Sequence, residues 1–97
     1  MARELEIPQA VYEDDAFDEV LRVWIASDAI ITMHNVFGPH AHNWGMVLAD
    51  IAMHIAKMRL EQDDIPEVET LQALEDGYRG RMSEQFNIQH RSLTGRN

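Results

Sequence analysis

The stretch from Asn43 to Gln62, NWGMVLADIAMHIAKMRLEQ, decides how the rest of this chain is expected to fold. Ala, Leu and Met are abundant in its interior, and these residues lose little conformational freedom in a helix. Asn43 is of a type that helix N-caps prefer, and Asp63 and Asp64 interrupt the pattern at the far end. The sequence therefore predicts one long helix over residues 43–62.

Apolar residues surround most of this predicted helix, whereas a surface helix needs an apolar stripe only a little wider than about 100°. We expect one apolar row of this helix to pack on a β-hairpin. The other row must also be shielded from water, and a second helix would cover only part of it. The first row is Leu48, Ile51, Ile55 and Met58, and the second is Ala49, Ala52, Met53 and Ala56.

Two strands are predicted before the long helix. Residues 20–26 and 29–37 are rich in β-branched and other apolar side chains, which suit strands. Ser27 and Asp28 supply turn chemistry between them, and so short a link favours an antiparallel hairpin. Loop residues 38–42 then lead into the long helix.

Residues 1–19 form a predicted N-terminal arm. Leu5 and Ile7 alternate with glutamates, a pattern compatible with a third edge strand or with an extended segment. Further along the arm, acidic residues surround Phe17, which is expected to anchor the segment. Such a dense acidic group is typical of a solvated lead-in that discourages edge pairing, rather than of a catalytic site.

A second helix is predicted to begin near Pro66, because proline costs nothing at the first helical position. Asp64 is the expected cap, and the acidic residues that follow suit the positive end of the helix dipole. Apolar residues recur at intervals of three and four up to Phe86, which indicates an amphipathic helix. Residues 87–97 are predicted to be a flexible basic tail.

Composition bounds the protein class. The 97 residues include no Cys, which excludes a disulfide scaffold and a thiolate metal site. Neither a secretory signal nor a membrane span is recognisable in the sequence, so we expect a cytoplasmic, soluble protein. Residues 1–76 carry 16 acidic and 4 basic side chains, a net charge of −12. This acidic body disfavours nucleic acid and anionic membranes as partners.

The predicted fold is a single α+β domain over residues 20–86. It consists of an antiparallel β-hairpin, with or without the N-terminal edge strand, packed against two α-helices. A two-stranded hairpin is only marginally stable by itself, and its second face would carry an exposed Trp24. Pairing two copies, edge to edge or helix to helix, would cover the apolar surface, so we expect a homodimer.

One polar row interrupts the long helix, at spacings of four, three and four residues: Asp50, His54, Lys57 and Glu61. Asp and His four residues apart can reach one cation, and the nearby His34, His40 and His42 could complete a zinc or other divalent-metal site. Such a pair is also common as a simple hydrogen bond or ion pair. The spacing departs from the zincin motif His-Glu-x-x-His, and no nucleophilic triad or phosphate-binding loop is recognisable.

The segments over residues 19–26 and 44–56 together resemble a family of small alphaproteobacterial proteins known only as a domain of unknown function. The resemblance spans about residues 18–60 and implies no activity, ligand or cofactor. It implies that six residues belong to a shared feature, either a binding site or a partly buried polar network. These are Arg22, Trp24, Trp44, Gly45, Asp50 and His54.

The sequence favours a non-enzymatic domain that acts through self-association and through binding a protein or ligand, without a cofactor. The alternative is an activity that depends on a divalent metal or small ligand and centres on Asp50 and His54, with His40 and His42 as further metal ligands.

Overall fold

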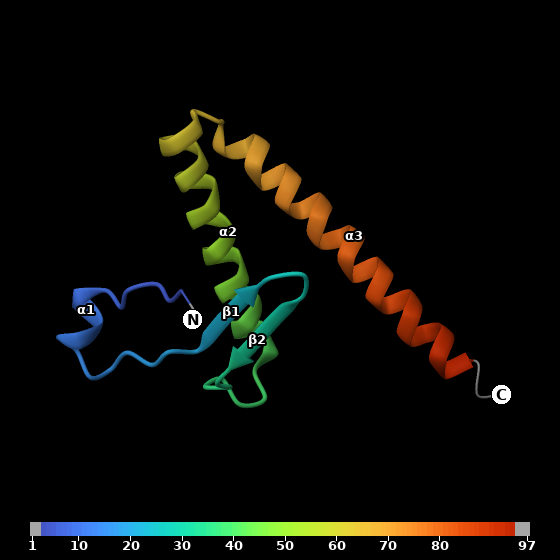
Figure 1. Ribbon diagram of the computed structural model, residues 1–97. Coiled ribbons are helices and arrows are strands. Elements are labelled where there is room, and N and C mark those ends of the chain that lie inside the picture. Colours follow the sequence, from blue (N-terminus) through green and yellow to red (C-terminus); the bar gives the residue numbers. More distant parts are fainter. Residues whose placement is uncertain (1–2, 95–97) are drawn as a thin grey trace. The chain divides into compact units, whose positions relative to one another are not determined.

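The computed structural model describes residues 3–94, with side chains described for residues 3–86. In chain order the elements are α1 (Gln9–Tyr12), β1 (Leu21–Ile25), β2 (Ala29–Met33), α2 (Ala41–Asp63) and α3 (Glu67–Thr94), as Figure 1 shows. The chain divides into two compact units, one ending at Pro39 and the other beginning at His40. A β-hairpin in the first and a helix pair in the second confirm the α+β class.

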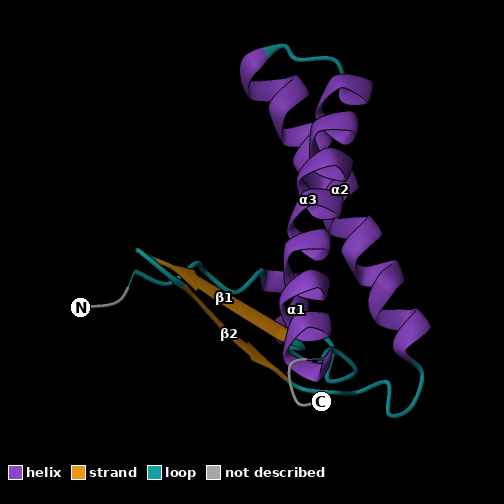
Figure 2. Cartoon of the chain, turned by 90° about the vertical axis from the view of Figure 1, so that its right-hand side faces the viewer, coloured by secondary structure: helices purple, strands orange, loops and turns teal. Residues whose placement is uncertain are grey.

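The first unit contains the predicted hairpin. Strands β1 and β2 lie side by side and antiparallel (Figure 2), with Val23 opposite Ile31 at the centre. Directly opposite residues share a face of the sheet, so Leu21, Val23 and Ile25 lie on the same face as their partners on β2. Both strands are shorter than predicted, and a turn over residues 36–39 replaces the end of the longer predicted strand.

The N-terminal arm is not a strand. Within the described residues the sheet has two strands, so the alternative with a third edge strand is wrong. The arm instead runs as an extended segment into the single turn of α1, which follows Pro8. Proline cannot donate a ladder hydrogen bond, and its fixed φ suits the start of a helical turn.

Helix α2 begins earlier than predicted. Its N-cap is His40, without a side-chain cap, and the amide of Asn43 donates to the His40 carbonyl at 3.0 Å. The prediction that Asn43 is the cap is therefore wrong, because the helix already includes Ala41. The cap preference of Asn is a weak local signal that two more helical residues override.

Asp64 ends α2 instead of capping α3. It has a left-handed backbone with φ of 57°. Its amide donates to the Leu60 carbonyl at 3.1 Å, and the Ile65 amide donates to the Arg59 carbonyl at 3.3 Å. Short polar side chains tolerate this conformation, which satisfies the last carbonyls of the helix. The prediction that Asp64 caps the second helix is therefore wrong.

Helix α3 starts directly after Pro66, whose carbonyl accepts from the amides of Glu69 and Thr70. Glu67 and Glu69 occupy its first turn, as predicted. The backbone stays helical to Thr94, beyond the amphipathic stripe and into the segment predicted as a tail; residues 95–97 lie outside the described residues. The boundaries of arm, domain and tail stay predictions.

Helices α2 and α3 pack against each other near their connecting turn. Among the side chains described, Ala56 and Thr70 are the buried ones, and Ala56 is fully enclosed. Small residues at such a contact allow two helix backbones to approach closely. Most large apolar side chains on both helices are exposed. No helix within residues 3–94 has the length and apolar character needed to cross a membrane.

Candidate functional site in the N-terminal unit

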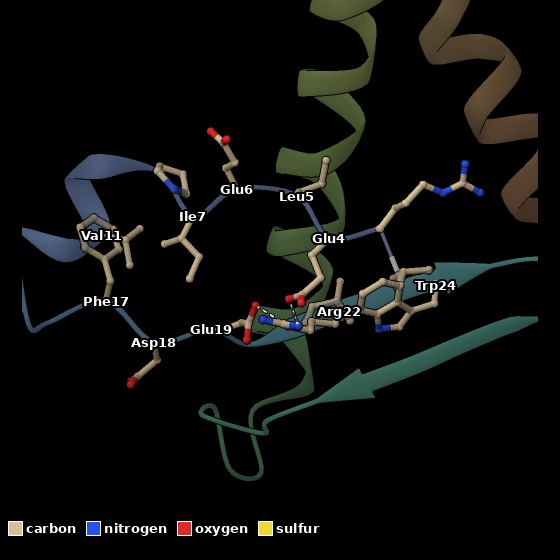
Figure 3. A pocket seen from close by; sticks show the side chains of 14 residues that line it. Glu4, Leu5, Glu6, Ile7, Val11, Phe17, Asp18, Glu19, Arg22 and Trp24 are labelled. Atoms are coloured by element: carbon tan, nitrogen blue, oxygen red, sulfur yellow. Dashed lines mark hydrogen bonds and ion pairs between the residues drawn. The ribbon is translucent and has the colours of Figure 1, made fainter. Parts of the chain in front are cut away.

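A pocket of about 420 Å³ lies between the N-terminal arm and β1. The arm supplies one wall from two stretches on either side of α1, and consecutive residues of β1 supply the other (Figure 3). The lining residues are Arg3, Glu4, Leu5, Glu6, Ile7, Pro8, Val11, Phe17, Asp18, Glu19, Leu21, Arg22, Val23 and Trp24.

Arg22 joins the arm to the strand. Its Nη1 donates to Glu4 Oε2 at 3.0 Å, and its Nε donates to Glu19 Oε2 at 2.8 Å. Figure 3 shows the guanidinium between the two carboxylates. Because a guanidinium presents several donors in a fixed plane, one arginine can hold two acids at once.

These two carboxylates raise the pKa of Arg22 above its ordinary value, with the hydrogen bond to Glu19 as the largest cause and that to Glu4 next. A raised pKa favours the charged form in the folded state. Any stabilisation from this shift is present at lower pH and is lost only as the pH rises through the raised value. Arg22 is therefore a permanent cation near neutral pH.

The rest of the lining is mostly apolar. Ile7, Val11 and Phe17 gather at the α1 end of the pocket, and Trp24 lies towards its other end (Figure 3). A pocket with an apolar lining and a few fixed charges is the usual form of a small-ligand site. The lining contains no hydroxyl, thiol or imidazole group, and its charged groups are carboxylates and guanidinium groups.

The structure brings together part of the feature implied by the family resemblance. Arg22 and Trp24 line the pocket, whereas Trp44, Asp50 and His54 belong to α2 in the second unit. Sequence reasoning missed the role of Glu4, which lies 18 residues before its partner Arg22. The alternation of Glu4, Leu5, Glu6 and Ile7 was the available signal, since it indicates an extended segment with one charged side.

Asp50 and His54 lie one turn apart on α2. The His54 Nδ1–H donates to the backbone carbonyl of Asp50 at 2.7 Å, which fixes the tautomer and leaves Nε2 available as an acceptor or ligand. Both residues line a shallow groove on the face of α2 whose other lining residues are apolar, namely Val47, Ile51, Ile55 and Met58.

The predicted metal ligands are not brought together. His40 precedes α2, and His42 lies in its first turn, two turns before Asp50 and three before His54. Among the residues that the structure describes, no three His, Asp or Glu side chains form a group that could hold a metal ion. Metal binding at these residues stays a prediction.

Residues 4–86 match a family model described as Domain of unknown function (DUF5076). The chain belongs to this family. The match includes the arm, the pocket, the hairpin and most of the helix pair, so the two units occur together within one family domain. No curated protein matches the chain.

A solved structure supports the fold. It is that of a protein described as a candidate pyruvate dehydrogenase from the photosynthetic bacterium Rhodopseudomonas palustrus CGA009, with 24% sequence identity and a TM-score of 0.69. The similarity covers 86% of this chain and 86% of that one. At this identity the likeness establishes a shared fold.

Proposed function

We propose that this DUF5076 domain is a non-enzymatic binding module that self-associates and holds a ligand between its N-terminal arm and β1. The observation that carries the proposal is the exposure of large apolar side chains on every element longer than one turn, while Ala56 is the sole buried apolar side chain among residues 3–86. Contiguous exposed apolar surface marks interaction sites.

Each unit by itself leaves large apolar side chains exposed. On β2 every residue is exposed, although Ala29, Ile30, Ile31 and Met33 are apolar, and a hairpin without further cover is marginally stable. In the helical unit, Met46, Leu48 and Met53 of α2 remain exposed, because α3 contacts α2 mainly near the connecting turn. A second copy of the chain is the partner we propose for these surfaces.

Sedimentation velocity tests the self-association. We expect a particle of twice 11.2 kDa at micromolar concentration, which dissociates on dilution. A particle of 11.2 kDa throughout this range would contradict the proposal.

The chemistry of the pocket suggests its ligand class. Four carboxylates and two arginines stand in the lining, and Arg22 is already held by Glu4 and Glu19. An anionic ligand would have to displace those carboxylates. A ligand with an apolar body and a positive group fits better, because Trp24 offers an aromatic face to a cation and the surrounding carboxylates favour positive charge.

Octyltrimethylammonium and nonanoate, both used below their micelle concentrations, test this choice with the same octyl chain and opposite charges. In a Trp44→Phe variant, Trp24 is the remaining tryptophan and reports on the pocket. We expect a saturable change in its fluorescence with the cation and a much weaker change with the anion. Phe17→Ala should weaken the response, since it removes apolar lining. An equal response to both probes contradicts the proposed ligand class.

A further inference from the structure

The backbone hydrogen bonds of the hairpin define which edge groups remain outside it. The His34 amide donates to the Val20 carbonyl and the Ala26 amide donates to the Asp28 carbonyl, both at 3.0 Å. Together with the strand register, these bonds show that the backbone amides and carbonyls of the even-numbered residues of β2 point towards β1. Because hydrogen-bonded and non-hydrogen-bonded pairs alternate in an antiparallel ladder, the amides and carbonyls of Ala29, Ile31 and Met33 point away from β1.

The two edges of the hairpin differ. The arm passes β1 on the side away from β2 (Figures 1 and 3), and Arg22 ties that edge to Glu4. Strand β2 contains no charged residue and no proline, and all five of its residues are exposed. Charges, prolines and covering segments are the devices that protect sheet edges. Within residues 29–33 there is neither a charge nor a proline, and no backbone hydrogen bond joins the outer edge of β2 to another described segment of the first unit.

We propose that β2 pairs with β2 of a second copy of the chain, antiparallel about a twofold axis that passes beside Ile31. This inference rests on the proposed self-association and assigns it a surface. A twofold axis makes an interface self-complementary, so one bare edge is enough for both copies. The helices cannot supply a strand to this edge, and the arm lies at the other one.

The backbone amides and carbonyls that point away from β1 determine the register of the proposed pairing between the two copies of β2. Ile31 lies opposite Ile31 of the partner subunit, and Ala29 lies opposite Met33 of the partner subunit, so that every outward amide and carbonyl of β2 has a partner. Shifting the register by two residues would leave groups of Ala29 or Met33 outside the strand pairing. The result is a four-stranded antiparallel sheet, which reaches the size at which sheets become independently stable.

The side chains suit this register. Ile31, Val23 and Met33 share one face of the sheet and are each about half exposed, so pairing extends their apolar face across the axis. At the strand ends, Asp28 comes beside His34 of the partner subunit, where a carboxylate and an imidazole can form a hydrogen bond. No like charges oppose each other along the paired edge.

Single cysteines test the pairing cleanly, because the chain contains no Cys. In the proposed register the two copies of residue 31 have Cα atoms about 5.5 Å apart, within the range that a disulfide bridges. We expect Ile31→Cys to form a covalent dimer under mild oxidation. Ile25→Cys is the matched control, because Ile25 lies on the same face and is more exposed, at 80% against 57% for Ile31. Its two copies would be three strand spacings apart, more than about 14 Å, and should stay uncrosslinked.

A double variant, Ala29→Cys with Met33→Cys, checks the register by placing one cysteine opposite the other across the axis. Covalent dimers from it and from Ile31→Cys, without dimers from Ile25→Cys, support the pairing. If the protein sediments as a dimer but Ile31→Cys and the double variant both fail to crosslink, or if Ile25→Cys crosslinks equally well, edge pairing is overturned and self-association stands. A monomer in sedimentation overturns both.

Discussion

The two units of this domain differ in the contacts that stabilise each of them internally. In the first unit, a strand ladder and the ion pairs of Arg22 with Glu4 and Glu19 join the segments, and no side chain among residues 3–39 is buried. In the second, two long helices meet through Ala56 and Thr70, which are buried. Polar contacts near solvent tolerate change, whereas a close helix contact does not. The first unit is therefore suited to adaptable binding, and the second to a fixed scaffold.

Ala56→Asp should have the largest effect, because it places an unpaired charge at a fully buried position of the helical unit. We expect a loss of about 3 kcal/mol in the free energy of unfolding, measured by helical ellipticity in urea. Ala49→Asp, at an exposed position of the same helix, should change stability by less than about 0.5 kcal/mol. Similar losses for both variants would show that the helix contact is not the fixed part of the structure.

Ile31→Lys should weaken the dimer by about 100-fold, since two like charges would meet on the proposed axis. Ile25→Lys makes the same change on the same sheet face, away from that axis, and should weaken it by less than about tenfold. Dissociation constants from sedimentation at several concentrations provide the measurement. Equal weakening by both variants would place the effect in general loss of apolar surface rather than in the β2 edge.

Thr70→Val should stabilise the protein by about 1 kcal/mol. The Thr70 Oγ1 atom is buried without a hydrogen-bond partner, and an unsatisfied buried hydroxyl costs free energy that an isosteric methyl avoids. Urea unfolding measures the change, with the exposed Thr32→Val as the control. A loss of stability in Thr70→Val would indicate that the hydroxyl is satisfied in solution.

Arg22→Gln should loosen the arm with little effect on the helical unit. We expect proteolysis after Glu4 and Glu6 to accelerate by less than about tenfold, because exposed ion pairs are weak, while the helical ellipticity stays unchanged. Arg79→Gln, which breaks a more exposed pair with Glu75 on α3, should leave arm cleavage unaffected. If arm cleavage does not respond to Arg22→Gln, the ion pairs do not hold the arm.

Zinc should have the smallest effect. Among the residues that the structure describes, no three metal-ligating side chains form a group that could hold the ion. We expect the melting temperatures of the native protein and of His54→Ala to stay the same with and without Zn²⁺. A rise that His54→Ala abolishes would instead favour the metal-dependent alternative.

The elements could be predicted from the sequence because their signals are local. The abundance of Ala, Leu and Met predicted the long helix, apolar periodicity predicted the second helix, and two β-branched runs with a short link predicted the antiparallel hairpin. The cap at Asn43 was wrong because local cap preferences are weak beside the tendency of a helix to extend. The left-handed turn at Asp64 was missed because the same residue type also suits an N-cap.

The pocket could be predicted only in part. Arg22 and Trp24 stand out by their place on a strand, but the partner carboxylate of Glu4 comes from a distant segment. Contacts between segments far apart in the chain leave no periodic signal in a single sequence. For the same reason, the spacing of His40, His42, Asp50 and His54 could not show whether four side chains would meet.

The reversal between α2 and α3 depends on very few residues. Asp64 adopts a backbone conformation that glycine and asparagine accept readily and that β-branched residues resist, and Pro66 prevents α2 from simply continuing. Natural variation at position 64 should therefore stay among small flexible or short amide and acid residues. A valine there would raise the energy of the folded-back arrangement and favour a straighter connection between the two helices, with Ala56 and Thr70 separated and open to water.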